Sequence, residues 1–211
     1  MPLQLQGNWS GLPSTICSHK SMAMTKNESA NPRVVSLDIR PRQLGYVIFE
    51  YPRLVDWGVM RFPRSSGHVD RSVKLLRTFQ PCVVVLREIA TGSRRDRPVV
   101  RDVIRSIQHE ASRLSLPSVF IGEAAVRRLF GEYVKPTKQE IASVVAACFP
   151  ELAYRLPPRR RPWDPEHHSM PIFDAAAMGL AAIACDFDAD SVRELLKSAK
   201  SFRRPLGGVA N

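Results

Sequence analysis

The sequence has few of the features that mark secreted, membrane-spanning or zinc-bound proteins. Only 4 of its 211 residues are cysteines, and no two of them form a Cys-x-x-Cys pair. This spacing argues against both a disulfide framework and a structural zinc site. The chain also lacks a secretory signal pattern and an apolar run of membrane-spanning length. We therefore expect a cytoplasmic protein whose cysteines are reduced, with Cys82, Cys148 and Cys185 in apolar runs as core residues.

Acidic side chains are in the minority. There are 20 Asp and Glu against 31 Lys and Arg, which gives a formal net charge of +11 and a pI near 10.1. Such an excess of positive charge favours a polyanionic partner such as nucleic acid, although it could serve solubility alone. A chain of this length with 44% hydrophobic residues is expected to form one sizeable soluble domain.

The two ends of the chain differ in composition from its middle. Residues 1–32 are rich in Ser, Asn, Gln and Met and have no apolar periodicity, which predicts a disordered leader. Residues 201–211 predict a basic flexible tail. The folded domain is therefore expected over residues 33–200.

Hydrophobic patterning predicts a sheet flanked by helices. Strand-like runs come first, at 34–40, 43–50 and 54–62, and the Pro41-Arg42 pair indicates a tight hairpin turn between the first two. Further strands are predicted at 82–86 and 118–121. Helices are predicted at 68–79, 99–115, 123–130, 137–149, 172–185 and 189–200, with Thr137 and Glu140 forming a capping box and an irregular segment at 156–171. This order favours an α/β fold with a mixed five-stranded sheet that begins with three antiparallel strands.

Three carboxylates occupy the ends of predicted elements. Asp38 interrupts the apolar first strand, Glu88 follows the fourth strand, and Asp174 opens an Ala-rich helix. An ionised Asp in a buried strand is costly unless a cation, an Arg or a helix N-terminus pairs with it. Taken alone, Glu88 could pair with a neighbouring arginine, and Asp174 could be a first-turn acid favoured by the helix dipole. Together, the three residues are candidates for one functional site.

These motifs together resemble the RuvC branch of the ribonuclease H-like superfamily. The resemblance covers about residues 34–185 and rests on Asp38 followed seven residues later by Gly45, on Val83-Val-Val-Leu-Arg-Glu88, on Lys135-Pro-Thr-Lys-Gln-Glu-Ile141 and on Asp174-Ala-Ala-Ala-Met-Gly-Leu-Ala181. It implies a ribonuclease H-like fold and a Mg²⁺-dependent endonuclease for branched DNA, with Mn²⁺ as an alternative metal. The resemblance also implies that Asp38, Glu88 and Asp174 are the catalytic metal ligands, and it suggests a homodimer.

One position departs from the RuvC pattern. Resolvases of this type usually carry another acid three positions before the helix aspartate, and here that position is Pro171. Candidates for a fourth ligand nearby are Asp164, Glu166, His167 and His168. The two histidines are auxiliary candidates that could equally be loop residues contacting phosphate or nothing. The missing acid leaves a catalytically inactive nucleic-acid-binding relative as an alternative.

Basic residues supply candidate DNA contacts. Lys138, at the start of a predicted helix, would contact the scissile phosphate unless it is a solvated surface lysine. Two loops carry arginines suited to backbone phosphates: Arg94, Arg95, Arg97, Arg159, Arg160 and Arg161. Trp163 would stack on a displaced base or anchor its loop. A less favoured alternative is an ASKHA-type ATPase or sugar kinase, because the chain is short and shows no second Gly-rich phosphate loop.

Overall fold

The computed structural model describes residues 32–62, 67–90, 92–93, 96–134, 137–159, 161 and 163–201. Most of the predicted leader and tail lies outside these residues, as do Arg94, Arg95 and Arg160. The described elements are, in chain order, β1 (Arg33–Arg40), β2 (Gln43–Glu50), β3 (Arg53–Arg61), α1 (Gly67–Phe79), β4 (Val83–Arg87), α2 (Pro98–Arg113), β5 (Ser118–Ile121), α3 (Glu123–Gly131), α4 (Lys138–Cys148), the 3₁₀ helix η1 (Pro150–Arg155), α5 (Met170–Asp186) and α6 (Ala189–Ser201).

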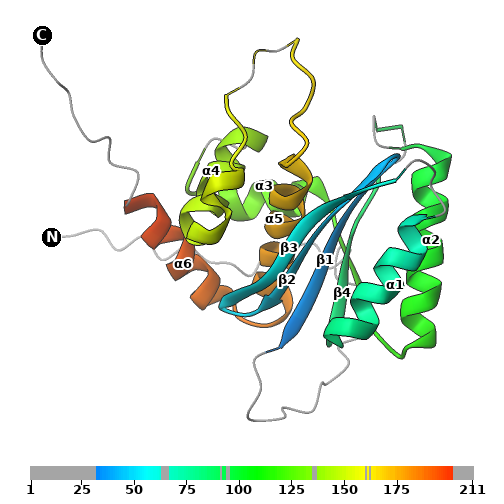
Figure 1. Cartoon of the computed structure of the whole chain (residues 1–211). Helices are drawn as coiled ribbons and strands as arrows, with labels where there is room; N and C mark the ends of the chain where they lie inside the picture. The colour runs from blue at the N-terminus through cyan, green and yellow to red at the C-terminus, as the bar shows by residue number, and fades with distance from the viewer. Residues whose placement is uncertain are drawn as a thin grey trace, which may run out of the picture. The chain divides into compact units, whose positions relative to one another are not determined.

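The described strands form one five-stranded sheet in the order β3-β2-β1-β4-β5 (Figure 1). The pairs β1–β2 and β2–β3 are antiparallel, whereas β4 runs parallel to β1 and β5 runs parallel to β4. The predicted mixed sheet, with three antiparallel strands first, is therefore confirmed. The turn between β1 and β2 falls at Pro41 and Arg42, as predicted.

The differences from the sequence predictions that bear on the site are a missed 3₁₀ helix and an earlier start of α5. Residues 150–155 form η1, which the sequence reading missed. Helix α5 begins at Met170, two residues earlier than predicted, because Pro171 lies in the first turn, where a missing N–H costs no helical hydrogen bond. Asp174 consequently lies in the second turn of α5, and its interpretation as a first-turn acid is wrong.

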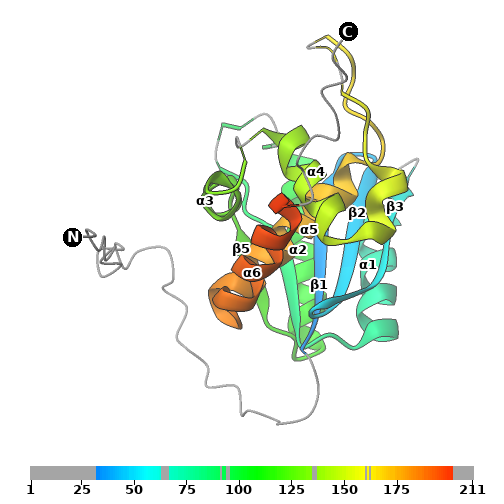
Figure 2. The ribbon, with the colours of Figure 1, turned by 90° about the vertical axis from the view of Figure 1, so that its left-hand side faces the viewer.

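Helices cover both faces of the sheet. Helices α1 and α2 pack on one face, against Val35, Leu37 and Val84, and α3 to α6 lie on the other (Figure 1). Figure 2 shows α6 on the outer side of α5. Among the described helices, none combines the length and apolarity that crossing a bilayer requires.

The cysteines of the described region are only partly in the core. Cys82 and Cys148 are half-buried, and Cys185 is exposed. The prediction of a core position is therefore wrong for Cys185, which lies in the last turn of α5, beyond the run of buried residues that ends at Ile183.

Close approach of α5 to the sheet sets the position of the helix. The Ser36 hydroxyl on β1 donates a hydrogen bond to the Ala175 carbonyl oxygen over 2.7 Å. A β-carbon on Gly45 of β2 would collide with the backbone of Pro171, and one on Gly179 would collide with the Phe49 ring. The small residues of the sheet and helix therefore let the first turns of α5 lie directly against β1 and β2.

Candidate active site

Asp38 is completely buried on β1 and is paired with two arginines. The Arg40 Nε donates to Asp38 Oδ2 over 2.7 Å, and the Arg87 Nε donates to Asp38 Oδ1 over 2.8 Å. Of the partners that the sequence left open for this carboxylate, the structure contains arginine. Each oxygen of the buried carboxylate accepts a charge-assisted hydrogen bond, which offsets the cost of burying the charge.

Strand geometry brings these three residues together. Asp38 and Arg40 are two positions apart on β1, so both side chains leave the same face of the sheet. Arg87 is the next residue after Leu86, which pairs with Leu37 in the parallel ladder, so it lies beside Asp38. His68, from the start of α1, lies 2.9 Å from the Arg40 carbonyl oxygen through its Nε2 and holds the end of β1.

Two more carboxylates contact the Arg40 guanidinium. Its Nη1 lies 2.7 Å from Glu166 Oε2, and its Nη2 lies 2.7 Å from Asp174 Oδ2. Arg87 Nη2 also lies 3.6 Å from Asp174 Oδ2. A single planar cation therefore holds one oxygen of each of three carboxylates, which come from β1, the segment before α5, and α5 itself.

Lys138 joins the group from the first residue of α4. Its Nζ lies 2.5 Å from Glu166 Oε1 and 3.3 Å from Asp174 Oδ2. The helix begins there because the Thr137 hydroxyl accepts a hydrogen bond from the Glu140 N–H, which confirms the predicted cap. The cap therefore fixes the point from which Lys138 reaches the carboxylates.

We call these six side chains the charge cluster: Asp38, Arg40, Arg87, Lys138, Glu166 and Asp174. Three carboxylates face three cations, so the cations relieve the repulsion that clustered carboxylates would otherwise feel. Exposure of the side chains rises from 0% at Asp38 to 13% at Asp174, 28% at Glu166 and 42% at Lys138. The charge cluster therefore opens to solvent on the side formed by Glu166 and Lys138.

Glu88 lies at the end of β4 but outside the charge cluster. The face of β4 that is turned toward α5 carries Val83, Val85 and the Arg87 side chain. Because side chains alternate along a strand, the next residue, Glu88, points away from that face. Its exposed side chain borders Gly122, just beyond β5, where a β-carbon would collide with Glu88 Oε2. Within the described residues, no group of three or more His, Cys, Asp or Glu is arranged to hold a metal. The role of Glu88 as a metal ligand stays a prediction.

The four candidates for the missing acid have different positions. Glu166 joins the charge cluster. The Asp164 carboxylate accepts a hydrogen bond from the Arg161 backbone N–H over 2.9 Å. The His167 Nδ1 lies 2.7 Å from the Ser169 hydroxyl, and His168 lies against a separate pocket. Glu166, which lies five residues before Pro171 in the sequence, thus reaches the side of α5 that carries Asp174.

Sequence reasoning did not single out Arg40 and Arg87. A signal for Arg40 was available, because a residue two positions after Asp38 on a strand shares its face. Arg87 could have been found in the same way, since it ends a strand whose apolar residues alternate between two buried faces. The arginines predicted to contact DNA all lie in predicted loops, whereas Arg40 and Arg87 end strands.

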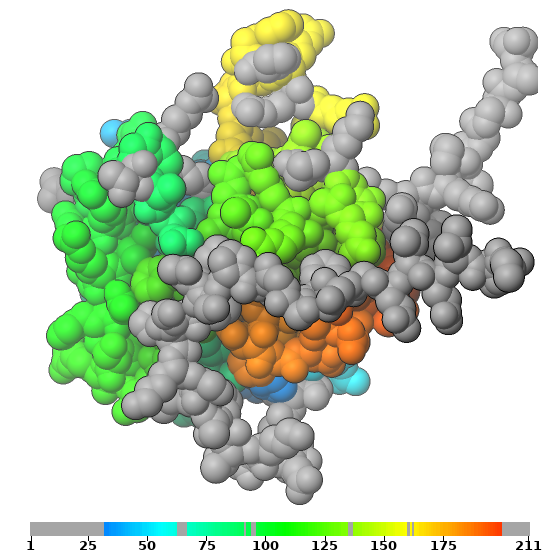
Figure 3. Space-filling model, turned by 180° about the vertical axis from the view of Figure 1, so that it is seen from behind, coloured from blue at the N-terminus to red at the C-terminus, as the bar shows by residue number. Residues whose placement is uncertain are grey.

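The loop arginines that the structure describes are not among the residues that define the charge cluster. Arg97 precedes α2, and Arg159 and Arg161 are exposed on the segment that stands out beyond α4 and α5 (Figures 1 and 3). On this segment the Arg161 guanidinium lies 5.9 Å from the centroid of the exposed Trp163 ring. Their contact with phosphates stays a prediction.

Comparison with solved structures identifies the fold. RuvC from Thermus thermophilus in complex with a Holliday junction substrate aligns with a TM-score of 0.54 and 19% identity, over 74% of this chain and 97% of that one. A second structure of Thermus thermophilus RuvC aligns with a TM-score of 0.52 and 19% identity, and the alignment covers 71% of this chain and 92% of that one. The yeast mitochondrial Holliday junction resolvase Ydc2 aligns with a TM-score of 0.50 and 13% identity, and the alignment covers 82% of this chain and 83% of that one.

The chain has a RuvC-like fold. The resemblance inferred from the motifs is thus confirmed at the level of architecture. No protein family and no curated protein matches the sequence itself. In this RuvC-like fold, the charge cluster lies where β1, β4, α4 and α5 meet.

Proposed function

We propose that this chain is a divalent-metal-dependent endonuclease that acts on branched DNA. The observation that carries the proposal is the gathering of Asp38, Glu166 and Asp174 around one point of a RuvC-like fold. The substrate class is supported by the solved RuvC complex with a Holliday junction and by the resolvase Ydc2. The formal charge of +11 is also in keeping with a polyanionic substrate.

The charge cluster contains the type of ligand atom that a hard divalent cation binds. Carboxylate oxygens are the ligands that Mg²⁺ and Mn²⁺ prefer, and three carboxylates meet at the Arg40 guanidinium. Asp38, Glu166 and Asp174 would hold the metal once Arg40 gives up its bonds to them. Glu88 would join them only after its side chain turned from Gly122 toward the charge cluster. Bound there, the metal would supply an activated water and charge stabilisation for phosphodiester hydrolysis.

The cations of the charge cluster have their own part in the proposed reaction. Arg40 and Lys138 would exchange their bonds with the carboxylates for bonds to substrate phosphates. Among the three cations of the cluster, Lys138 is the most exposed, at 42% against 11% for Arg40 and 10% for Arg87, so it is best placed to meet a phosphate first. Arg87 is paired with Asp38 on the inner side, and it would keep that carboxylate oriented.

A second function is favoured by the charge balance of the site. Three carboxylates already have three basic partners, so the charge cluster needs no metal to be electrostatically satisfied. This supports a binding protein for branched DNA that has no cleavage activity. The two functions differ in metal binding and in cleavage, and they agree in DNA binding.

The test is a panel of duplex, fork, four-way junction and RNA–DNA hybrid substrates, incubated with and without Mg²⁺ or Mn²⁺. The endonuclease is expected to cleave a branched substrate only with metal, and Asp38→Asn is expected to abolish this cleavage. Asp102→Asn on α2, an exposed carboxylate paired with Arg105, is the matched control and should cleave normally. Tight junction binding without cleavage under any metal condition would favour the binding protein instead.

A further inference from the structure

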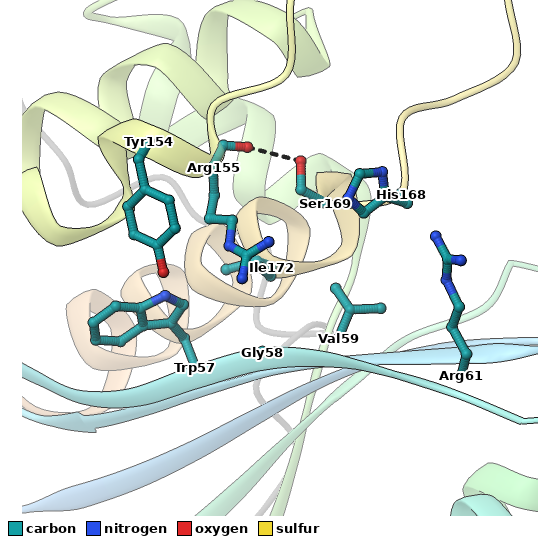
Figure 4. Close-up of a pocket in the computed structure, with 9 residues that line it drawn as sticks. All are labelled: Trp57, Gly58, Val59, Arg61, Tyr154, Arg155, His168, Ser169 and Ile172. Atoms are coloured by element: carbon teal, nitrogen blue, oxygen red, sulfur yellow. Dashed lines mark hydrogen bonds between the residues drawn. The ribbon is translucent and has the colours of Figure 1, made fainter.

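A separate pocket lies beside the edge strand of the sheet. It is formed by β3, the end of η1 and the start of α5, and its volume is about 500 Å³ (Figure 4). Its walls are Trp57, Gly58, Val59 and Arg61 of β3, Tyr154 and Arg155 of η1, and His168, Ser169 and Ile172. We call it the β3–η1 pocket. Its size falls in the range of about 300–1,000 Å³ that small-molecule sites occupy.

The pocket forms because side chains of β3 point toward α5 while α5 itself does not extend fully over this edge strand. Trp57, Val59 and Arg61 are spaced by two on β3 and so share the face turned toward α5. Helix α5 lies mainly over β1 and β2, which leaves β3 at the margin of the covered area. The opposite wall is held in place because the buried Ser169 hydroxyl donates to the Arg155 carbonyl oxygen over 2.7 Å.

Two aromatic rings are available inside the β3–η1 pocket. Figure 4 shows Tyr154 reaching from η1 toward the Trp57 indole on β3. Tyr154 is 71% exposed, although a large aromatic side chain usually gains from burial. The Arg155 guanidinium lies 5.0 Å from the centroid of the Tyr154 ring, so the ring already accepts a planar cationic group on one face.

The charge of the β3–η1 pocket is positive. Its described lining includes Arg61, Arg155 and His168 and contains no Asp or Glu. The pKa of His168 is lowered from its usual value by desolvation and then by the positive charges of His167, Arg61 and Arg155. A planar aromatic surface beside two arginines suits a ligand that has a flat ring system and an anionic group.

We propose that the β3–η1 pocket binds one unpaired nucleotide of the DNA substrate, with its base against Trp57 and Tyr154 and its phosphate at Arg61 and Arg155. The proposal rests on the proposed function for the presence of a DNA substrate. Stacking on aromatic rings accepts any base, and unpaired bases become available where strands branch. Because α5 carries Ile172 in the pocket wall and Asp174 in the charge cluster, a nucleotide held here positions the strand near that cluster.

The experiment uses Trp57 as the reporter. The full chain contains 3 tryptophans, so Trp9→Phe with Trp163→Phe leaves Trp57 as the single fluorophore. A short single-stranded oligothymidylate is titrated into this protein, and saturable quenching of Trp57 is expected when a base stacks on the indole. Adding Tyr154→Ala is expected to raise the Kd about fivefold to a hundredfold, the usual consequence of losing one base–aromatic stack.

Matched variants separate stacking and local charge from general effects. Tyr154→Phe keeps the ring and should bind as the parent does, whereas Arg155→Ala should bind several-fold more weakly. Arg193→Ala on α6 removes an equal charge from an exposed ion pair and should change little. Because Tyr154 and Arg155 are exposed, circular dichroism should show unchanged folding in their variants.

The outcomes distinguish this pocket from the proposed function. The nucleotide site is overturned if the quenching of Trp57 does not saturate. It is also overturned if both Tyr154→Ala and Arg155→Ala bind the oligothymidylate as tightly as the parent does. Equal weakening by Arg193→Ala overturns it too, because the interaction would then depend on overall charge. Junction cleavage without Trp57 quenching removes the pocket and leaves the endonuclease. If Trp57 is quenched specifically but the chain cleaves no substrate, the endonuclease proposal is rejected and the nucleotide-site proposal is retained.

Discussion

The two faces of β1 are equally buried, yet only one of them carries polar side chains. Val35, Leu37 and Ile39 pack on the α1 and α2 side, where the surroundings are apolar. Ser36 and Asp38 on the other face are also fully buried, and each has polar partners. The comparison teaches that burial alone does not decide composition. A charge is tolerated in the interior where other elements supply enough partners for it.

The partners of the polar face come from distant parts of the chain. Arg87, Lys138, Glu166 and Asp174 belong to four different segments. The apolar face needs only complementary shape and contributes about 1.5–3 kcal/mol for each fully buried aliphatic side chain. The polar face needs every partner in place, because losing one leaves a buried charge unpaired. The following predictions test this difference.

The largest effect is expected for Asp38→Asn. The change leaves Arg40 and Arg87 without the charge that they share, so the free energy of unfolding should fall by about 3–5 kcal/mol. In the proposed endonuclease, cleavage should fall by about 100-fold or more, since a proposed ligand of the metal that stabilises transition-state charge is lost. Urea denaturation and a junction-cleavage time course measure the two effects. An unchanged denaturation midpoint would contradict the structural role of these ion pairs.

On the apolar face, Leu37→Ala should lower the free energy of unfolding by about 2–5 kcal/mol, because it leaves a cavity against α1 and α2. Cleavage per folded molecule should stay close to that of the parent, since Leu37 points away from the charge cluster. Val55→Ala, at an exposed position of β3, is the control and should change stability by less than about 0.5 kcal/mol. Loss of specific activity in folded Leu37→Ala would show that the two faces are not independent.

Gly45→Ala tests how the polar face depends on α5. The added methyl would meet the Pro171 backbone, so α5 must shift, and stability should fall by about 1–3 kcal/mol. Cleavage should fall as well, since Asp174 moves with the helix. Gly131→Ala in α3 has open space around the new methyl and should be neutral or slightly stabilising. Equal thermal melting of both glycine variants would rule out this packing argument.

The smallest effect on stability is expected for Lys138→Ala. Its ion pairs are partly exposed, so solvent screening limits the loss to less than about 1 kcal/mol. Junction binding should weaken, and the slope of log K against log salt should become shallower by about one unit if Lys138 contacts a phosphate. Binding isotherms at several salt concentrations provide the measurement. Lys197→Ala, an exposed lysine of α6, should leave that slope unchanged.

Much of the fold could be predicted from local patterns. The apolar runs of β1, β2 and β4, the Pro41-Arg42 turn and the Thr137 cap each depend on neighbours in sequence, and the structure confirms them. The start of α5 was missed because a proline can either end an irregular segment or begin a helix. The short helix η1 was missed because residues 150–155 carry too few positions to show a helical period.

The candidate site was only partly predictable. Asp38 and Asp174 were expected to meet, and both contact Arg40 and Arg87. Glu88 was expected with them, yet Arg87 takes the position beside Asp38, because alternation along β4 places neighbouring residues on opposite faces. The β3–η1 pocket had no signal in the sequence, since Trp57 and Tyr154 are nearly a hundred residues apart.

The sequence by itself determined the order of strands and helices, the positive charge, and the buried carboxylate at Asp38 that needed a partner. These properties follow from side-chain chemistry and from periodicity within one segment. Only the tertiary structure decided which partners Asp38 obtained and which of the acids near Pro171 joined the charge cluster. The reason is that strand register and the close packing of α5 bring together groups up to 139 positions apart, and no local pattern encodes their distances.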